Sequence, residues 1–260
     1  MFAKNWIFVV SLGVLALALT AVPAGATVII SDGFSGADGA ALNGRTPDGT
    51  NLPGVNWQIT GGYFGSPSIS SNTLDVPSIG GGALNISSVG SYTKPTVMTI
   101  AADLEVGNLN GGDNPEGMGL GFWSALHPGG GSLTDFYGLM LRNNGSLSLT
   151  KETTVYQTVA WAGSAFSTNT FYTLSYSVDT NTGRVTSVSL AGSTADYSAI
   201  INDTTVLFTD TNTKYAGIRA DAGSAGRHGY ADNFNLTPEP ATMALLGLGG
   251  LGLILSRKRK

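Results

Sequence analysis

Residues 172–190 read YTLSYSVDTNTGRVTSVSL. Apolar and polar side chains alternate over 172–178 and again over 184–190, which is the period of a strand with one buried face. The segment between them, 179–183, consists of turn-forming residues and ends in glycine. The stretch therefore predicts a β-hairpin.

The same signals recur along most of the chain. Asn143-Asn144-Gly145 predicts a second turn, between strands at 136–142 and 146–150. No window carries a convincing helical repeat. Further strands are expected at 96–106, 117–124, 155–161, 206–208, 215–219 and 230–236. Many short strands separated by turns predict an all-β body, a two-sheet antiparallel β-sandwich of the jelly-roll kind spanning residues 27–237.

The amino end has the features of a secretory signal peptide. Lys4 gives a positive start, residues 6–21 are almost wholly apolar, and Ala24-Gly25-Ala26 has the small residues that signal peptidase reads. We expect residues 1–26 to be removed and the mature chain to begin at Thr27. The alternative, a permanent membrane anchor, is less favoured because the run is short and ends in a cleavable site.

The carboxyl end combines three signals. Pro238-Glu239-Pro240 is followed by an apolar run at 241–255, and the chain stops on four basic residues, Arg257, Lys258, Arg259 and Lys260. Prolines keep the tripeptide out of a helix, and a basic end stays on the cytoplasmic side of a bilayer. The apolar run is shorter than the ~20 residues of a full membrane helix, so we expect a transient transmembrane anchor.

This tail, residues 238–260, resembles the PEP-CTERM sorting signal of exported bacterial proteins. The resemblance implies an exosortase as a partner. It also implies a precursor held transiently in the inner membrane, and a final location at the cell surface or in the extracellular matrix. The tail describes the destination of the protein and leaves the role of the body open.

The amino-acid composition excludes several kinds of site and partner for the body. The chain has no cysteine, which excludes disulfides, cysteine–zinc sites and thiol nucleophiles. All 17 acidic residues lie between 27 and 240, whereas five of the 13 basic residues lie in the targeting segments. The body is therefore acidic, with 8 basic residues against 17 acidic ones. An acidic, lysine-poor body argues against nucleic acid as a partner.

The order of motifs resembles a concanavalin A-like lectin/glucanase jelly roll of the laminin-G-like kind. The opening segment is Ser31-Asp32-Gly33-Phe34, then residues 42–48 and Trp57. The central and last strands are matched by GLGFW at 119–123, FYGL at 136–139, GSL at 145–147, YAGIR at 215–219 and ADNF at 231–234. The match spans most of residues 31–236.

A catalytic site is not recognisable. Jelly-roll glucanases hydrolyse with two carboxylates on one strand, and none of the four glutamates lies in their pattern. Asp103-Leu104-Glu105 comes nearest, with both acids on one face of a strand. We therefore assign no catalytic residue. A glycoside hydrolase or lyase with an unrecognised site stays as an alternative.

One structural calcium ion is a further expectation. In β-sandwich glycan-binding modules that this chain resembles, acids on the first and last strands often share such an ion. Asp32 and Asp232 occupy those positions. The competing interpretation is that Asp32 caps a turn and Asp232 bonds to backbone.

Aromatic residues are the candidates for binding sugar. Trp123 and Tyr137 lie on neighbouring expected strands, and we expect them to form a stacking platform on the concave sheet. Core burial is the alternative for each residue. The sequence thus predicts an exported, non-enzymatic protein that binds extracellular polysaccharide, with a purely structural or adhesive matrix protein as a further alternative.

Overall fold

A computed structural model describes residues 29–61, 66–77, 80–85, 95–106, 116–126, 135–151, 154–161, 165–207, 214–221 and 227–238. Residues 28–238 form one compact unit. The expected signal peptide, the apolar run at 241–255 and the basic tail lie outside the described residues. Within the described ranges, no helix has the length and apolar character needed to cross a membrane.

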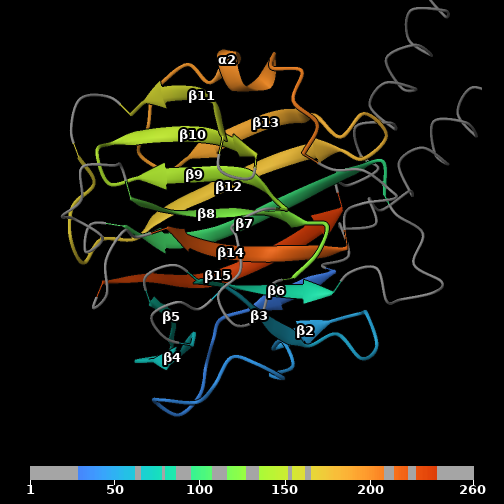
Figure 1. Cartoon of the computed structure of the whole chain (residues 1–260), viewed down its shortest axis with the longest axis vertical. Coiled ribbons are helices and arrows are strands. Elements are labelled where there is room, and N and C mark those ends of the chain that lie inside the picture. The colour runs from blue at the N-terminus through green and yellow to red at the C-terminus, as the bar shows by residue number, and fades with distance from the viewer. Residues whose placement is uncertain are drawn as a thin grey trace, which may run out of the picture. The chain divides into compact units, whose positions relative to one another are not determined.

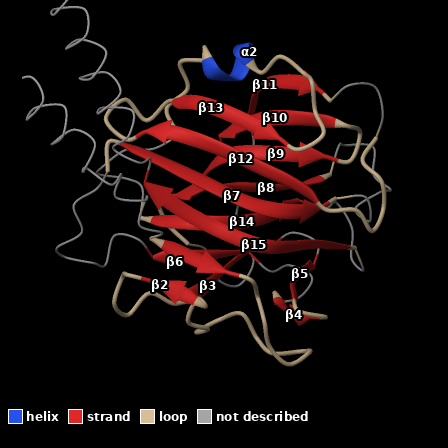
Figure 2. Ribbon diagram, turned by 180° about the vertical axis from the view of Figure 1, so that it is seen from behind, coloured by secondary structure: helices blue, strands red, loops and turns tan. Residues whose placement is uncertain are grey.

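The body is a sandwich of two antiparallel sheets that face each other, as Figures 1 and 2 show from opposite sides. Sheet A has eight strands. Six of them lie side by side in the order β13 (Val185–Leu190), β12 (Tyr172–Asp179), β7 (Val97–Glu105), β15 (His228–Pro238), β1 (Ile30–Asp32) and β2 (Gly49–Thr50). The other two are β5 (Thr73–Pro77), which pairs with β15, and β4 (Ser68–Ser70), which pairs with β5. The predicted two-sheet antiparallel sandwich is confirmed.

Sheet B has seven strands. Their order is β11 (Thr154–Ala160), β10 (Ser146–Lys151), β9 (Phe136–Arg142), β8 (Gly117–Trp123), β14 (Tyr215–Asp221), β6 (Gly80–Asn85) and β3 (Trp57–Gly61). The single helical turn α2 (Ser198–Ile201) contacts β11 and β13 at one end of the sandwich (Figure 1). Nearly all the strands expected from the alternating patterns are present within a residue or two of their expected ends.

The two predicted hairpins are present. β12 pairs with β13 as expected, with one irregularity after Ser177. The second turn joins β9 to β10, and Gly145 adopts a φ of 85° that favours glycine. The strand expected at 206–208 is not formed at its described residues, and residue 208 lies outside the described part of the chain. Residues 206 and 207 lie outside any strand, because the backbone of Leu207 is used in a single hydrogen bond to the Gly183 carbonyl.

Apolar side chains from the inner faces of both sheets form one core. Alternate residues of β7 and β12 point inward, so the strand period of two separates a buried face from a polar outer face. Tyr176 of sheet A reaches across this core, and its hydroxyl donates a 3.0 Å hydrogen bond to the Leu120 carbonyl of sheet B. Complete burial raises the pKa of the Tyr176 hydroxyl well above its ordinary value.

Candidate functional site

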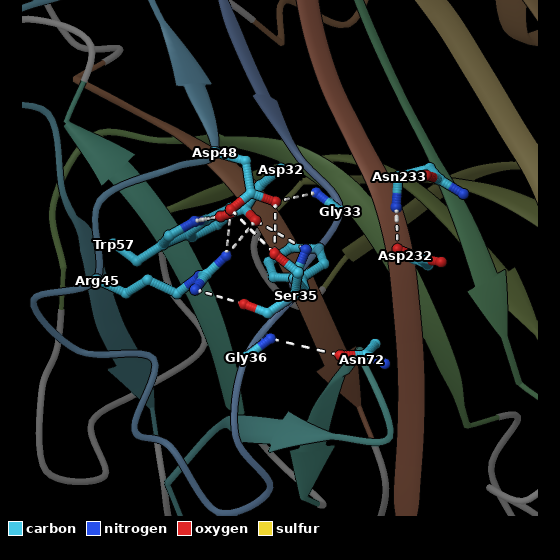
Figure 3. A network of polar contacts seen from close by, with 11 residues as sticks. Asp32, Gly33, Ser35, Gly36, Arg45, Asp48, Trp57, Asn72, Asp232 and Asn233 are labelled. Carbon is cyan, nitrogen blue, oxygen red and sulfur yellow. Dashed lines mark hydrogen bonds and ion pairs between the residues drawn. The ribbon is translucent and has the colours of Figure 1, made fainter.

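The buried carboxylate of Asp32 organises the chain that follows β1 (Figure 3). Its Oδ1 atom accepts hydrogen bonds from the Phe34 backbone N–H at 2.8 Å and from Arg45 Nη2 at 2.9 Å. Its Oδ2 atom accepts one from the Trp57 indole N–H at 2.6 Å. Three donors from separate parts of the opening segment therefore converge on one carboxylate.

Arg45 extends this network to the surface. Its Nη2 atom also contacts Asp48 Oδ1 at 2.7 Å, and its Nη1 atom donates to the Ser35 carbonyl at 2.9 Å. Asp48 in turn accepts the Gly33 N–H at 3.1 Å. The hydrogen bond to Asp32 is the main cause that raises the pKa of Arg45 above its ordinary value. The guanidinium is thus a fixed positive charge that closes the loop between β1 and β2.

Aromatic rings surround the Asp32–Trp57 contact. The Trp57 ring lies 5.4 Å from the Phe34 ring and 5.3 Å from the Phe234 ring, centroid to centroid. All three side chains are fully buried. An indole N–H in such surroundings needs an acceptor, and Asp32 supplies it. The Asp32 network is therefore a structural hub of the fold.

The calcium site shared by Asp32 and Asp232 stays a prediction, and this geometry does not favour it. The prediction gave the Asp32 oxygens to a metal ion shared with Asp232, but they accept protein donors, and the positive charge beside them is Arg45. Asp232 lies on the separate strand β15 and accepts the Asn233 backbone N–H at 2.7 Å (Figure 3). In the described part of the chain, no three histidine or acidic side chains gather as metal ligands. The backbone contacts of Asp32 and Asp232 are those that the turn-capping interpretation expects.

Asp232 belongs instead to a polar patch on the outer face of sheet A. It is the cross-strand neighbour of Asp103 on β7, which is in turn the neighbour of Thr173 on β12. Asp103 accepts hydrogen bonds from the Thr173 hydroxyl and, at 2.8 Å, from Asn233 Nδ2. Asn233 has a φ of 51° at an irregularity of β15, which turns its amide toward Asp103.

Tyr230 completes this patch two residues earlier on the same strand. Its cross-strand neighbours are Asp75 on β5 and Glu105 on β7. Burial is the main cause that raises the pKa of Tyr230, and these two carboxylates add to it. We define the outer patch by the six residues Asp75, Asp103, Thr173, Tyr230, Asp232 and Asn233.

Within the described residues, two hydrogen-bond acceptors of the outer patch have no partner, and we call them open acceptors. Asp232 Oδ1 accepts one backbone N–H, whereas its second oxygen and the Tyr230 hydroxyl have no hydrogen-bond partner within the described residues. Burial is the main cause that raises the pKa of Asp232, and the charges of Asp103 and Asp32 raise it further. The patch can therefore accept hydrogen bonds from a ligand and offers an aromatic ring beside them.

The predicted aromatic platform is not formed. Trp123 is the cross-strand neighbour of Phe136, and Tyr137 is the neighbour of Phe122. Because Phe122 belongs to the main core, Tyr137 lies on the inner face of sheet B, whereas Trp123 lies on the outer face. Two side chains on opposite faces of a sheet cannot stack on one sugar.

Trp123 is also nearly inaccessible, with 3% of its surface exposed. It packs edge-on against Phe136 at 4.9 Å and forms a small second cluster with Phe136 and Met140. The glycines of β8 make room for this cluster, since a Cβ at Gly121 would lie 2.6 Å from the Phe136 ring. Tyr137 carries the Lys151 ammonium 5.5 Å above its ring. Both aromatic residues therefore have packing roles.

The sequence pointed to part of this arrangement and missed the rest. The opening segment, with Asp32 and Trp57, was singled out, but the contact between them was not foreseen. Asp103 was noted only as the nearest approach to a catalytic pair. Tyr230 was missed, because a lone tyrosine in an alternating strand does not differ from a packing residue.

Only the start of the predicted sorting signal is described. Pro238 is the last residue of β15, while Glu239, Pro240, Arg257, Lys258, Arg259 and Lys260 lie outside the described residues. Residues 236–260 match the family described as the PEP-CTERM protein-sorting motif. The predicted resemblance of the tail is confirmed. The motif marks the chain as an exported protein with a membrane-anchored precursor.

A search of curated protein sequences found no match to the chain. Among solved structures, it is similar to the carbohydrate recognition domain of Emp47p, with a TM-score of 0.48 and 13% identity over 82% of this chain and 97% of that one. It is similar to the alginate lyase Aly36B in complex with alginate tetrasaccharide, with a TM-score of 0.46 and 14% identity over 82% and 99%.

A third similar structure is the exoplasmic/lumenal domain of VIP36 in a Ca²⁺- and Man3GlcNAc-bound form. Its TM-score is 0.41, with 11% identity over 70% of this chain and 82% of that one. Lectin-type and enzyme structures occur together among these distant likenesses. Similarity at this level carries no functional information for the chain.

Proposed function

We propose that the body is a non-enzymatic glycan-binding domain that uses the outer patch of sheet A. The observation that supports this most directly is the pair of open acceptors, the second oxygen of Asp232 and the hydroxyl of Tyr230, on one sheet face. Sugar hydroxyls donate to carboxylate and phenol oxygens, and the amide group of Asn233 adds a donor and an acceptor. A sugar ring also packs well on an aromatic face.

The charge of the outer patch sets the class of glycan. Asp75, Asp103 and Asp232 lie on three adjacent strands of one face. The acidic body adds to their field, since it carries 17 acidic and 8 basic residues. Polyanions such as nucleic acid or a uronate polymer are repelled by this field. The proposed ligand is a neutral extracellular polysaccharide.

The sorting motif at 236–260 supports the proposed location. We propose that signal peptidase removes residues 1–26 and that an exosortase processes the carboxyl end. The body then reaches the cell surface or an exopolysaccharide matrix, where it binds the polysaccharide. A structural calcium ion is not part of this proposal, because Arg45 already balances the Asp32 carboxylate.

A glycoside hydrolase is the second candidate, and one observation favours it. Asp103 and Asp232 are cross-strand neighbours, and burial together with the charge of Asp103 raises the pKa of Asp232. Two neighbouring carboxylates can act as acid and base on a glycosidic bond. Both oxygens of Asp103 are held by hydrogen bonds from Thr173 and Asn233, which favours binding over catalysis.

The test is a glycan array probed with the purified mature protein, run beside a reducing-sugar assay on the same glycans. Retention without release of reducing ends supports the proposed function. Release of reducing ends that Asp232→Asn abolishes supports the hydrolase instead. Absence of both retention and release on every neutral glycan contradicts the proposal and leaves a structural or adhesive matrix protein.

A further inference from the structure

The sorting motif and the β-sandwich share residues. The family match begins at residue 236, whereas β15 continues to Pro238. The first proline of the Pro-Glu-Pro tripeptide is therefore also the last residue of a strand. No spacer separates the sheet from the tripeptide that the processing enzyme is expected to read.

The shared residues are held from both sides, because β15 lies inside sheet A between β7 and β1. Leu236 is fully buried and is the cross-strand neighbour of Ile100 on β7 and of Ile30 on β1. Its carbonyl accepts the Ile29 N–H at 2.9 Å. The two residues after it, Thr237 and Pro238, still face Thr99 and Met98 on β7.

A peptide-cleaving enzyme must bind the backbone around the bond that it cuts. A segment whose hydrogen-bonding groups are used within a sheet becomes accessible only when the strand opens locally. Opening β15 as far as Leu236 would expose a core side chain and break the pairing with both β7 and β1. A bond before Pro238 is thus protected by the folded body, and a bond after it is not part of any described strand.

We infer that the exosortase cuts on the carboxyl side of Pro238 and that residues 236–238 stay in the mature protein as the end of β15. The inference rests on the exosortase processing in the proposed function and adds the position of the cut. It has a second consequence. Pro238 is the last residue of β15 and also the first residue of the tripeptide that the exosortase reads. The enzyme can therefore bind Pro238 only when this end of the strand leaves the sheet, and the short distance between the sheet and the tripeptide limits the rate of processing.

The position is tested on the full chain, produced in a host that contains the exosortase, by intact-mass measurement of the exported protein. The expected mature chain ends at Pro238 or at a later residue that precedes the apolar run. A chain that ends at Thr237 or earlier overturns the inference while the sorting assignment stands. A chain that still ends at Lys260 overturns both, and glycan binding by the body is measured independently of either outcome.

The competition is tested by moving the tripeptide relative to the sheet and following conversion of the precursor in a pulse–chase. Inserting Gly-Ser-Gly-Ser between Thr237 and Pro238 should speed conversion and lengthen the mature chain by the inserted residues. Deleting Thr237 draws the tripeptide toward the sheet and should make precursor accumulate. The same insertion after the exposed Thr194 is the matched control and should convert like the unaltered chain. Equal conversion of all four chains contradicts the competition.

Discussion

The indole nitrogen of Trp57 donates a 2.6 Å hydrogen bond to the carboxylate of Asp32, and this contact joins strand β3 of sheet B to strand β1 of sheet A. Both residues are buried, and the same carboxylate accepts Arg45 at 2.9 Å. The link between the sheets is therefore polar at its centre and aromatic around it.

Asp32→Asn should destabilise the fold strongly. The substitution keeps the shape of the side chain but leaves the Arg45 charge without its buried partner, and breaking a buried ion pair costs about 3 kcal/mol or more. Because Arg45 is partly exposed, we expect the lower end of that range. Urea unfolding measures the loss. Asp48→Asn, at the exposed end of the same network, should cost less than about 1 kcal/mol. Equal losses of unfolding free energy in Asp32→Asn and Asp48→Asn would contradict the role of Asp32 as a structural hub of the fold.

Trp123→Ala should unfold the protein more readily rather than weaken sugar binding directly. The side chain is 3% exposed and packs against Phe136, so its removal leaves a cavity that costs roughly 3–5 kcal/mol. Thermal melts of the variant, beside a polysaccharide-retention assay, distinguish packing from binding. An unchanged melting temperature together with lost retention would restore Trp123 as a ligand-binding residue.

Asp232→Asn should raise stability at neutral pH. Folding raises the pKa of Asp232, so the protonated form is favoured in the folded protein and the charged form opposes folding. The advantage of the variant is therefore present at pH 7 and disappears as the pH falls below the ordinary value of 3.8. Since the side chain is partly exposed, the gain is below about 1 kcal/mol, which is less than the ~2–4 °C in melting temperature that a full 1 kcal/mol would give. A variant less stable than the unaltered protein at pH 7 would contradict the conclusion that burial and nearby negative charge disfavour the ionised form of Asp232 in the folded protein.

Replacing Pro238-Glu239-Pro240 by alanines should leave uncleaved precursor in the inner membrane. The substitution removes the tripeptide that precedes the apolar run while the core residue Leu236 is kept. Mass spectrometry of membrane and exported fractions measures the outcome. Pro53→Ala, in an exposed loop, is the matched control for loss of a proline. Full processing of the alanine variant would show that the tripeptide is not read.

Local alternation was enough to predict the sandwich, because strand period and turn residues act within a few positions of each other. The strand expected at 206–208 is absent at residues 206 and 207, because a short apolar run can also belong to a loop held by one backbone hydrogen bond. Here that bond is donated by the Leu207 N–H to the Gly183 carbonyl. The prediction of a stacking platform of Trp123 and Tyr137 was wrong for a different reason. Whether Trp123 and Tyr137 share a face depends on the register of β8 against β9, which places Trp123 opposite Phe136.

The partners of Asp32 and the outer patch depend on long-range pairing. Asp32 and Trp57 are separated by 25 positions, and Asn233 and Asp103 by 130. No local pattern reports such contacts. Residue type alone identified Asp32 and Asp232 as acids on the first and last strands, but their roles are determined by the donors that the fold brings to each carboxylate.

Glycan binding by the outer patch is tested most directly by affinity electrophoresis of Tyr230→Ala in gels that contain the neutral polysaccharide identified on the array. Loss of one aromatic contact should weaken retention roughly two- to tenfold, with the melting temperature close to that of the unaltered protein. Tyr156→Ala, which removes an aromatic side chain that is 45% exposed on β11 of sheet B, should leave retention unchanged. Unchanged retention of Tyr230→Ala, or an equal loss in Tyr156→Ala, would contradict glycan binding by the outer patch.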